Sequence, residues 1–152
     1  MKILVSDDVS EKGVELLRQH GYEVDVKTNL DEQGLIDCIG EYDGMVTRSM
    51  THVTEKVIAA GKKLKVIGRA GVGVDSIDIK AATARGIIVV NAPTANTIAA
   101  TEHTCAMIMA ITRHIPQAHN SLMAGEWDRE RFTGIQLQNK TIGIIGVGRI
   151  GS

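Results

Sequence analysis

The chain has 152 residues, a formal net charge of −1, 43% hydrophobic residues and only 3% aromatic residues. This length suits one domain, or a small domain with part of a second. The near-neutral charge gives no electrostatic basis for binding nucleic acid or an anionic membrane surface, and the few aromatic residues provide no stacking platform for bases. We therefore expect neither a nucleic-acid partner nor a membrane partner.

The two cysteines, Cys38 and Cys105, have no metal-ligand or redox spacing. We expect them to be reduced, buried residues of a cytoplasmic protein. The N-terminus lacks the long apolar run of a signal peptide, and the most apolar stretch, residues 105–111, is too short to span a bilayer. No His, Cys, Asp or Glu residues have the spacing of metal ligands, so we expect no metal site.

Short apolar runs alternate with amphipathic segments over the first ninety residues. We predict strands at residues 3–5, 24–26, 44–47, 64–68 and 87–90. Helices are predicted around residues 14–17, 35–39, 57–58 and 77–85, with Ser10 and Thr54 as N-caps of the first and third. Short strands alternating with helices favour a parallel sheet covered on both faces. The fold class is therefore α/β, with a flavodoxin-like or Rossmann-like sheet whose second strand lies nearer the edge.

The character of the chain changes after Pro93. One long helix is predicted from about Asn96 to Ile115, and a second from Pro116 to near Gly125. Residues 126–138 are predicted to form a surface connection that carries Trp127 and Phe132. We place a domain boundary near residues 93–97, so that residues 1–95 form a substrate-binding segment and residues 96–152 begin a second domain.

An apolar run and three glycines follow in residues 141–151. The run 141–145 predicts a buried parallel strand, and the glycines have the spacing of the phosphate-binding turn of a dinucleotide-binding fold. Gly146 would permit the tight turn, Gly148 would let the backbone approach a pyrophosphate, and Gly151 would let a helix pack closely. The alternative is a glycine-rich turn in another kind of α/β protein. We expect a chain truncated within this loop, before the helix and the acidic residue that complete such a site.

Two arginines follow the third and fourth predicted strands: Arg48 and Arg69. Ligands of open parallel sheets bind at the carboxyl ends of the strands. Arg69 also opens the glycine-rich run 69–75, whose backbone N–H groups could bind an anion. Two guanidinium groups beside such a run suit a substrate with two acidic groups, such as a phosphate and a carboxylate. The alternative is that both arginines are surface residues paired with nearby aspartates, namely Asp7, Asp8 or Asp75.

The start of the long helix carries polar residues with two possible roles. Asn96 and Thr97 could cap the helix, which is the default role, or contact a nicotinamide ribose or the substrate from a cleft between domains. Glu102 and His103 lie further along the helix. We expect them to be structural, because a helical histidine beside an apolar run is usually not catalytic.

The run 69–75, the segment Asn91-Ala92-Pro93, Asn96, Glu102 and the glycine-rich turn together resemble the D-isomer-specific 2-hydroxyacid dehydrogenases. The order and spacing agree over residues 2–152. This resemblance implies a homodimeric or homotetrameric NAD-dependent oxidoreductase acting on a phosphorylated 2-hydroxy acid, with a dimer interface that includes the long helix. The implied substrate-binding residues are Arg48, Arg69, Gly71, Val72 and Gly73. The implied cofactor-binding residues are Val72, Asn96, Thr97, Gly146, Gly148, Arg149, Ile150 and Gly151.

The resemblance has two departures. Ser76 stands where members of the family usually have Asn. The catalytic arginine, glutamate and histidine of the family follow the cofactor turn, so we expect no catalytic residue in this chain and no activity of the chain alone. Three alternatives remain: a related dehydrogenase acting on glyoxylate, hydroxypyruvate or D-lactate, an NAD-sensing transcriptional co-repressor in which the fold is a binding module, and a naturally short protein.

Overall fold

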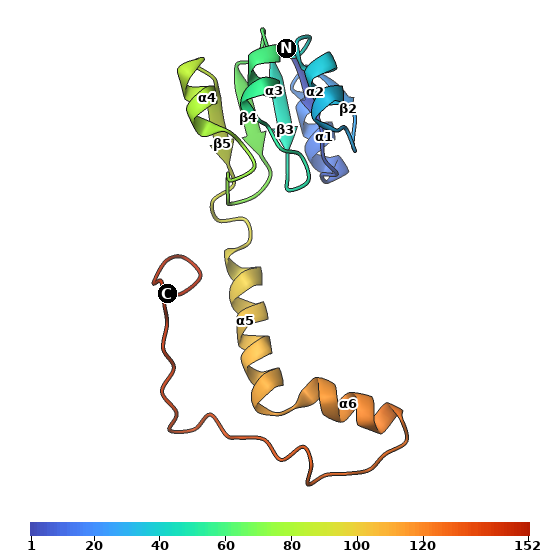
Figure 1. Cartoon of the computed structure of the whole chain (residues 1–152), viewed down its shortest axis with the longest axis vertical. Helices are drawn as coiled ribbons and strands as arrows, with labels where there is room; N and C mark the ends of the chain where they lie inside the picture. Colours follow the sequence, from blue (N-terminus) through green and yellow to red (C-terminus); the bar gives the residue numbers. More distant parts are fainter. The chain divides into compact units, whose positions relative to one another are not determined.

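The computed structural model describes all 152 residues, which divide into two compact units, Met1–Ala95 and Asn96–Ser152. The first unit is a five-stranded parallel sheet with flanking helices (Figure 1). Its strands are β1 (Lys2–Val5), β2 (Glu23–Val26), β3 (Gly44–Thr47), β4 (Val66–Arg69) and β5 (Ile88–Asn91). Its helices are α1 (Glu11–Gln19), α2 (Glu32–Ile39), α3 (Glu55–Ala60) and α4 (Ile79–Ala84). The predicted α/β fold class with a parallel sheet is confirmed.

The strand order is β2-β1-β3-β4-β5. This is the doubly wound order in which the chain reverses direction across the sheet between β1 and β3. Ligands of such folds bind outside the carboxyl ends of the strands at this switch point. The predicted edge position of the second strand is also confirmed, since β2 pairs only with β1.

Alternate strand residues point to opposite faces of the sheet, and each face has its own apolar cluster. On one face Leu4, Met45 and Ile67 pack in a cluster with residues of α2, α3 and α4. On the other face Ile3, Val5 and Val24 pack against Val14 of α1. The strands that carry the candidate site are thus packed on both faces.

Both predicted N-cap residues of the first unit occupy the N-cap positions, but only one of them forms a side-chain cap hydrogen bond. The Thr54 side chain accepts a hydrogen bond from the backbone N–H of Val57 at 3.5 Å, so it caps α3 as predicted. Ser10 occupies the N-cap position of α1, but its side chain makes no cap hydrogen bond. Its predicted N-cap position is therefore confirmed, but the side-chain hydrogen bond of a cap is not formed.

Two predicted boundaries in the first unit are shifted. β4 extends to Arg69, and Leu64, which was expected to open this strand, lies in the core before it. α4 begins at Ile79 rather than at residue 77. The reason is that Ile77 forms a β-bridge with Val53, while the Asp78 carboxylate caps the helix.

The second unit contains α5 (Thr97–Thr112) and α6 (Ile115–Met123). The long helix ends three residues earlier than predicted, because His114 adopts a left-handed conformation with φ 53°. No helix of the structure is long and apolar enough to cross a membrane.

The strand predicted at residues 141–145 is absent. The segment has no regular secondary structure, and the Ile145 side chain is fully exposed. A strand is stabilised by pairing with neighbours, and nothing in the chain pairs with this segment. The apolar pattern alone therefore gave a wrong prediction here.

Candidate functional site

The candidate anion site lies at the carboxyl edge of the sheet, where β1, β3, β4 and β5 end. The register places Thr47, Arg69 and Asn91 in one row across β3, β4 and β5. Neighbouring strands lie about 4.8 Å apart, so Arg48, one residue past this row, is close in the backbone to Arg69. β1 is the strand beside β3, and Asp7 follows it by two residues. The structure thus brings both predicted arginines to the switch point.

The two arginines differ in burial. Arg48 is exposed, whereas Arg69 is half-buried and its Nε is buried without a hydrogen-bond partner. Neither guanidinium forms an ion pair with a carboxylate. The alternative of surface arginines paired with nearby aspartates is therefore not what the structure contains. An unsatisfied buried N–H is costly, so Arg69 is held in this position at a loss of stability.

The glycine loop (residues 70–75) is anchored from β5 and the residue after it. The Asn91 side-chain amide donates to the carbonyl of Val72 at 2.7 Å, and the backbone N–H of Ala92 donates to the carbonyl of Gly71 at 2.9 Å. A methyl group at position 71 would overlap the Arg69 guanidinium, so a side chain there would force that guanidinium to move. The backbone of the glycine loop therefore lies directly against the Arg69 side chain.

Only part of the expected backbone anion site is present in the glycine loop. The N–H of Gly71 donates to the carbonyl of Arg69 at 2.8 Å, so it is not available to a ligand. The N–H groups of Val72 and Gly73 make no hydrogen bond within the chain. The Asp75 carboxylate lies close to Gly73 and adds negative charge there. Attraction for an anion at this edge must therefore come mainly from the guanidinium groups.

Ser76, which departs from the usual pattern of the family, lies just beyond the glycine loop. Its carbonyl accepts a hydrogen bond from the N–H of Val53 at 2.8 Å. Its hydroxyl oxygen is buried without a partner. The backbone of this residue thus joins the glycine loop to the segment that follows β3, while the hydroxyl contributes no contact.

Asp7 was missed as a site residue in the sequence, although it directly follows the first strand at the same edge. It is only 5% exposed, and its carboxylate accepts hydrogen bonds from Thr47, Arg48 and Thr51. Burial alone would raise the pKa of Asp7. The hydrogen bonds, led by the one from the Thr51 hydroxyl, outweigh burial and hold the pKa below its usual value. Asp7 is therefore a charged carboxylate at neutral pH.

This pKa shift predicts how stability depends on pH. Because the folded-state pKa of Asp7 lies below the unfolded value of 3.8, the stabilisation is complete above that pH and is lost as the pH falls through the folded-state pKa. Asp25 and Asp43 shift in the same direction, through hydrogen bonds from Tyr42 and from the backbone N–H of Lys2. We expect urea unfolding of Asp7→Asn to show a weaker acid dependence than wild type between roughly pH 5 and pH 2. A constant difference between the two curves over that range would contradict the assignment.

The predicted cofactor residues all lie in the second unit, apart from Val72. Asn96 is at the N-cap position of α5, as the default role predicts, although its side chain makes no cap hydrogen bond. Gly146 has φ +95°, the conformation expected of a tight glycine turn. A side chain on Gly151 would overlap the carbonyl oxygen of Gly146, and space around Gly148 is open. The turn therefore needs glycine at the first and third positions and leaves the second open to a ligand.

The start of a helical turn follows these glycines. The N–H of Ser152 donates to the carbonyl of Gly148 at 3.0 Å, and the Thr101 hydroxyl of α5 donates to the carbonyl of Ile150 at 3.2 Å. A helix N-terminus at this place is the feature that binds a pyrophosphate in dinucleotide-binding folds. Residues 146–152 therefore form a glycine turn that continues into a single helical turn, without the expected strand before it.

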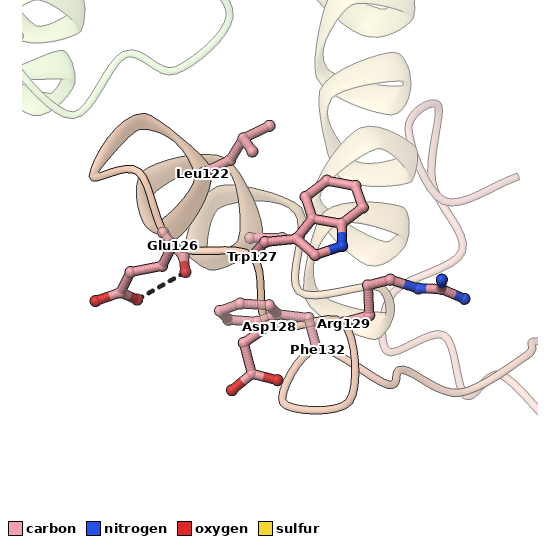
Figure 2. A pocket seen from close by; sticks show the side chains of 8 residues that line it. Leu122, Glu126, Trp127, Asp128, Arg129 and Phe132 are labelled. Carbon is pink, nitrogen blue, oxygen red and sulfur yellow. Dashed lines mark hydrogen bonds between the residues drawn. The ribbon is translucent and has the colours of Figure 1, made fainter.

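A separate hollow of about 230 Å³ lies in the second unit (Figure 2). Trp127 and Phe132 line it, and the Ser121 hydroxyl donates to the Glu126 carboxylate at 2.9 Å beside them. It contains none of the predicted site residues. Glu102 and His103 are exposed on α5, and no group of three His, Cys, Asp or Glu side chains is placed to hold a metal ion.

The sequence profile of the family "D-isomer specific 2-hydroxyacid dehydrogenase, catalytic domain" matches residues 3–145. The chain belongs to this family. Among its relatives, the D-3-phosphoglycerate dehydrogenases of Synechocystis and Archaeoglobus fulgidus are 54% and 52% identical to it over 151 residues. The enzyme of the same name from Homo sapiens is 46% identical over 150 residues. Each alignment covers 99% of this chain but only 27%, 29% and 28% of the respective relative, so the chain spans less than a third of their length.

Solved structures show the same similarity. The TT0316 protein of Thermus thermophilus has a TM-score of 0.90 and 32% identity, over 99% of this chain and 50% of that one. The NAD⁺-bound 3-phosphoglycerate dehydrogenase of Entamoeba histolytica has a TM-score of 0.78 and 32% identity, over 99% of this chain and 48% of that one.

Proposed function

We propose that residues 1–152 belong to an NAD-dependent D-3-phosphoglycerate dehydrogenase, which oxidises 3-phospho-D-glycerate to 3-phosphohydroxypyruvate in serine biosynthesis. Residues 1–95 would bind substrate, and residues 96–152 would begin the NAD-binding domain. The names of relatives at 46–54% identity support this proposal. The observation that carries it is the pair of guanidinium groups without ion-pair partners at the switch point.

The substrate has two anionic groups, a phosphate and a carboxylate, and each can accept charge-assisted hydrogen bonds from an arginine. Arg48, which is exposed, would bind the phosphate, and Arg69, whose Nε lacks a partner, would bind an acidic group beside the glycine loop. The chemistry that a bound NAD would supply is a hydride acceptor for C2 of the substrate. Residues 146–151 would hold its pyrophosphate. The residues that move the hydroxyl proton are proposed to lie outside this chain.

The remaining properties follow from the same proposal. The enzyme would be cytoplasmic and would act as a homodimer or homotetramer on a small-molecule substrate. The isolated chain would bind substrate weakly and would not turn it over, because it holds anchoring residues without a proton-transferring group.

The test is an assay of NADH production by a full-length protein that carries these residues, with 3-phospho-D-glycerate, D-glycerate and D-lactate compared. We expect the phosphorylated acid to have the highest kcat/KM. A higher kcat/KM for an unphosphorylated acid would contradict the proposed substrate and would indicate a related dehydrogenase that acts on that acid. Negligible turnover of all three acids, with NAD still bound, would favour a binding module. NADH production by the 152-residue chain alone would contradict the assignment of catalysis to residues outside it.

A further inference from the structure

We propose that Asp7 is a positioning residue whose carboxylate fixes the Arg48 loop (residues 48–52) and so holds Arg48 where it meets the substrate. The ligand part of this inference rests on the proposed function. The loop part stands on geometry alone, and the experiment below separates the two.

All the hydrogen bonds that the Asp7 carboxylate accepts come from residues near the two ends of the Arg48 loop. Its Oδ2 accepts from the Thr47 hydroxyl at 3.2 Å, from the backbone N–H of Thr51 at 3.3 Å, and from the backbone N–H of Arg48. Its Oδ1 accepts from the Thr51 hydroxyl at 2.8 Å. Because both ends of the segment converge on one carboxylate, their separation is fixed by the two oxygen atoms of Asp7.

The rest of the loop has little else to hold it. Arg48, Ser49 and Met50 are exposed, and Met50 is 82% exposed. Beyond the loop, Val53 is buried and bonded to the carbonyl of Ser76, so the chain is anchored again there. The segment between these anchors keeps its conformation through Thr51 and the hydrogen bonds to Asp7.

The negative charge of Asp7 should by itself weaken the binding of an anionic substrate at this site. A buried carboxylate beside a place for an anion repels that anion, and no lysine, arginine or histidine forms an ion pair with Asp7. If Asp7 acted only through its charge, removal of the charge would strengthen substrate binding. If it acts by fixing the loop, removal would weaken binding. The two roles thus predict opposite signs.

Asp7→Asn is the decisive variant, since the side chain keeps its size but its amide nitrogen cannot accept a hydrogen bond. Asp8→Asn is the matched control: it removes the same charge from the neighbouring exposed residue, whose side chain makes no hydrogen bond or ion pair. The 152-residue chain is titrated with 3-phospho-D-glycerate, and backbone hydrogen exchange is followed by NMR. Thr51→Val, which keeps the carboxylate and removes one donor, provides a milder variant should Asp7→Asn not fold.

We expect Asp7→Asn to bind the ligand at least about fivefold more weakly and to exchange the N–H protons of Arg48 and Thr51 at least about tenfold faster. Amides of β4 and β5 should exchange faster only by the factor that the loss of global stability gives, and Asp8→Asn should bind like wild type or slightly more tightly. In a full-length enzyme, Asp7→Asn should raise KM for the acid and leave KM for NAD unchanged.

Unchanged exchange at Arg48 and Thr51 in Asp7→Asn, or in Thr51→Val if that variant replaces it, would overturn the proposal whatever the binding result. Faster exchange with equal or tighter ligand binding would overturn the positioning of Arg48. If the wild-type chain and the full-length enzyme both fail to bind 3-phospho-D-glycerate, the proposed function fails and the ligand part falls with it. The exchange measurement then still decides whether Asp7 fixes the loop.

Discussion

Arg48→Ala is expected to weaken the binding of 3-phospho-D-glycerate by about tenfold to a hundredfold, because a charge-assisted hydrogen bond contributes about 1.5–3 kcal/mol. The side chain is exposed and makes no ion pair, so its loss should change the free energy of unfolding by less than about 0.5 kcal/mol. The measurement is KM for the phosphorylated acid and for D-glycerate in a full-length protein. The effect should be much smaller for D-glycerate, which lacks the phosphate.

Two control variants sharpen this experiment. Arg48→Lys keeps the charge and loses the planar two-point contact, so an intermediate effect is expected. Lys62→Ala removes an equal charge from an exposed residue after α3 whose side chain makes no ion pair, and it should leave KM unchanged. An equal loss on phosphorylated and unphosphorylated acids in Arg48→Ala would contradict the assignment of the phosphate to this residue.

Ile67→Ala should have the largest effect on stability, lowering the free energy of unfolding by about 2–5 kcal/mol. Ile67 is fully buried in β4, between β3 and β5, and packs in the larger of the two apolar clusters. Truncation leaves a cavity that surrounding helices can fill only in part. Urea denaturation of the 152-residue chain measures the change.

Ile67→Val is the graded control, with an expected loss of about 0.5–1.5 kcal/mol. Leu16→Ala, on a side chain of α1 that is 55% exposed, should change stability by no more than about 0.5 kcal/mol. If Ile67→Ala proved no more costly than Leu16→Ala, the packing described for β4 would be wrong.

Most of the first unit could be predicted because its strands and helices have local signals. Short apolar runs gave every strand of the sheet, and the run 44–47 matched β3 residue for residue. The position of Arg48 and Arg69 at one edge also followed from sequence, since parallel strands bring their carboxyl ends together. What these residues bind remains a prediction.

Features that depend on distant contacts could not be predicted. Asp7 is 40 or more residues away in sequence from every residue that donates to it. Nothing local to residues 6–8 indicates that the backbone of Thr51 will reach it. A local feature was missed as well: the composition of the glycine loop suggested free N–H groups, but the N–H of Gly71 donates to the carbonyl of Arg69, two residues earlier, and composition does not give the loop conformation that allows this.

The failure at residues 141–145 has the same physical origin. An apolar run shows that a segment should be buried, but burial in a strand needs a partner with matching hydrogen-bonding groups. Here Ile142, Ile144 and Ile145 are exposed. Sequence periodicity describes what a segment needs, and only the remainder of a chain can supply it.

The row formed by Thr47, Arg69 and Asn91 limits how this chain can vary in length. Deleting one residue inside β4 would shift the pairing of the strand residues that follow it by one position and turn their side chains to the opposite face. The Arg69 side chain would then no longer lie beside Gly71, where the absence of a side chain leaves room for its guanidinium. The amino-acid composition of the chain would hardly change. Loops at the amino ends of the strands, such as the turn at His20 and Gly21 before β2, carry no such constraint. Insertions and deletions should therefore be tolerated at that edge and excluded from the strands that carry the arginines.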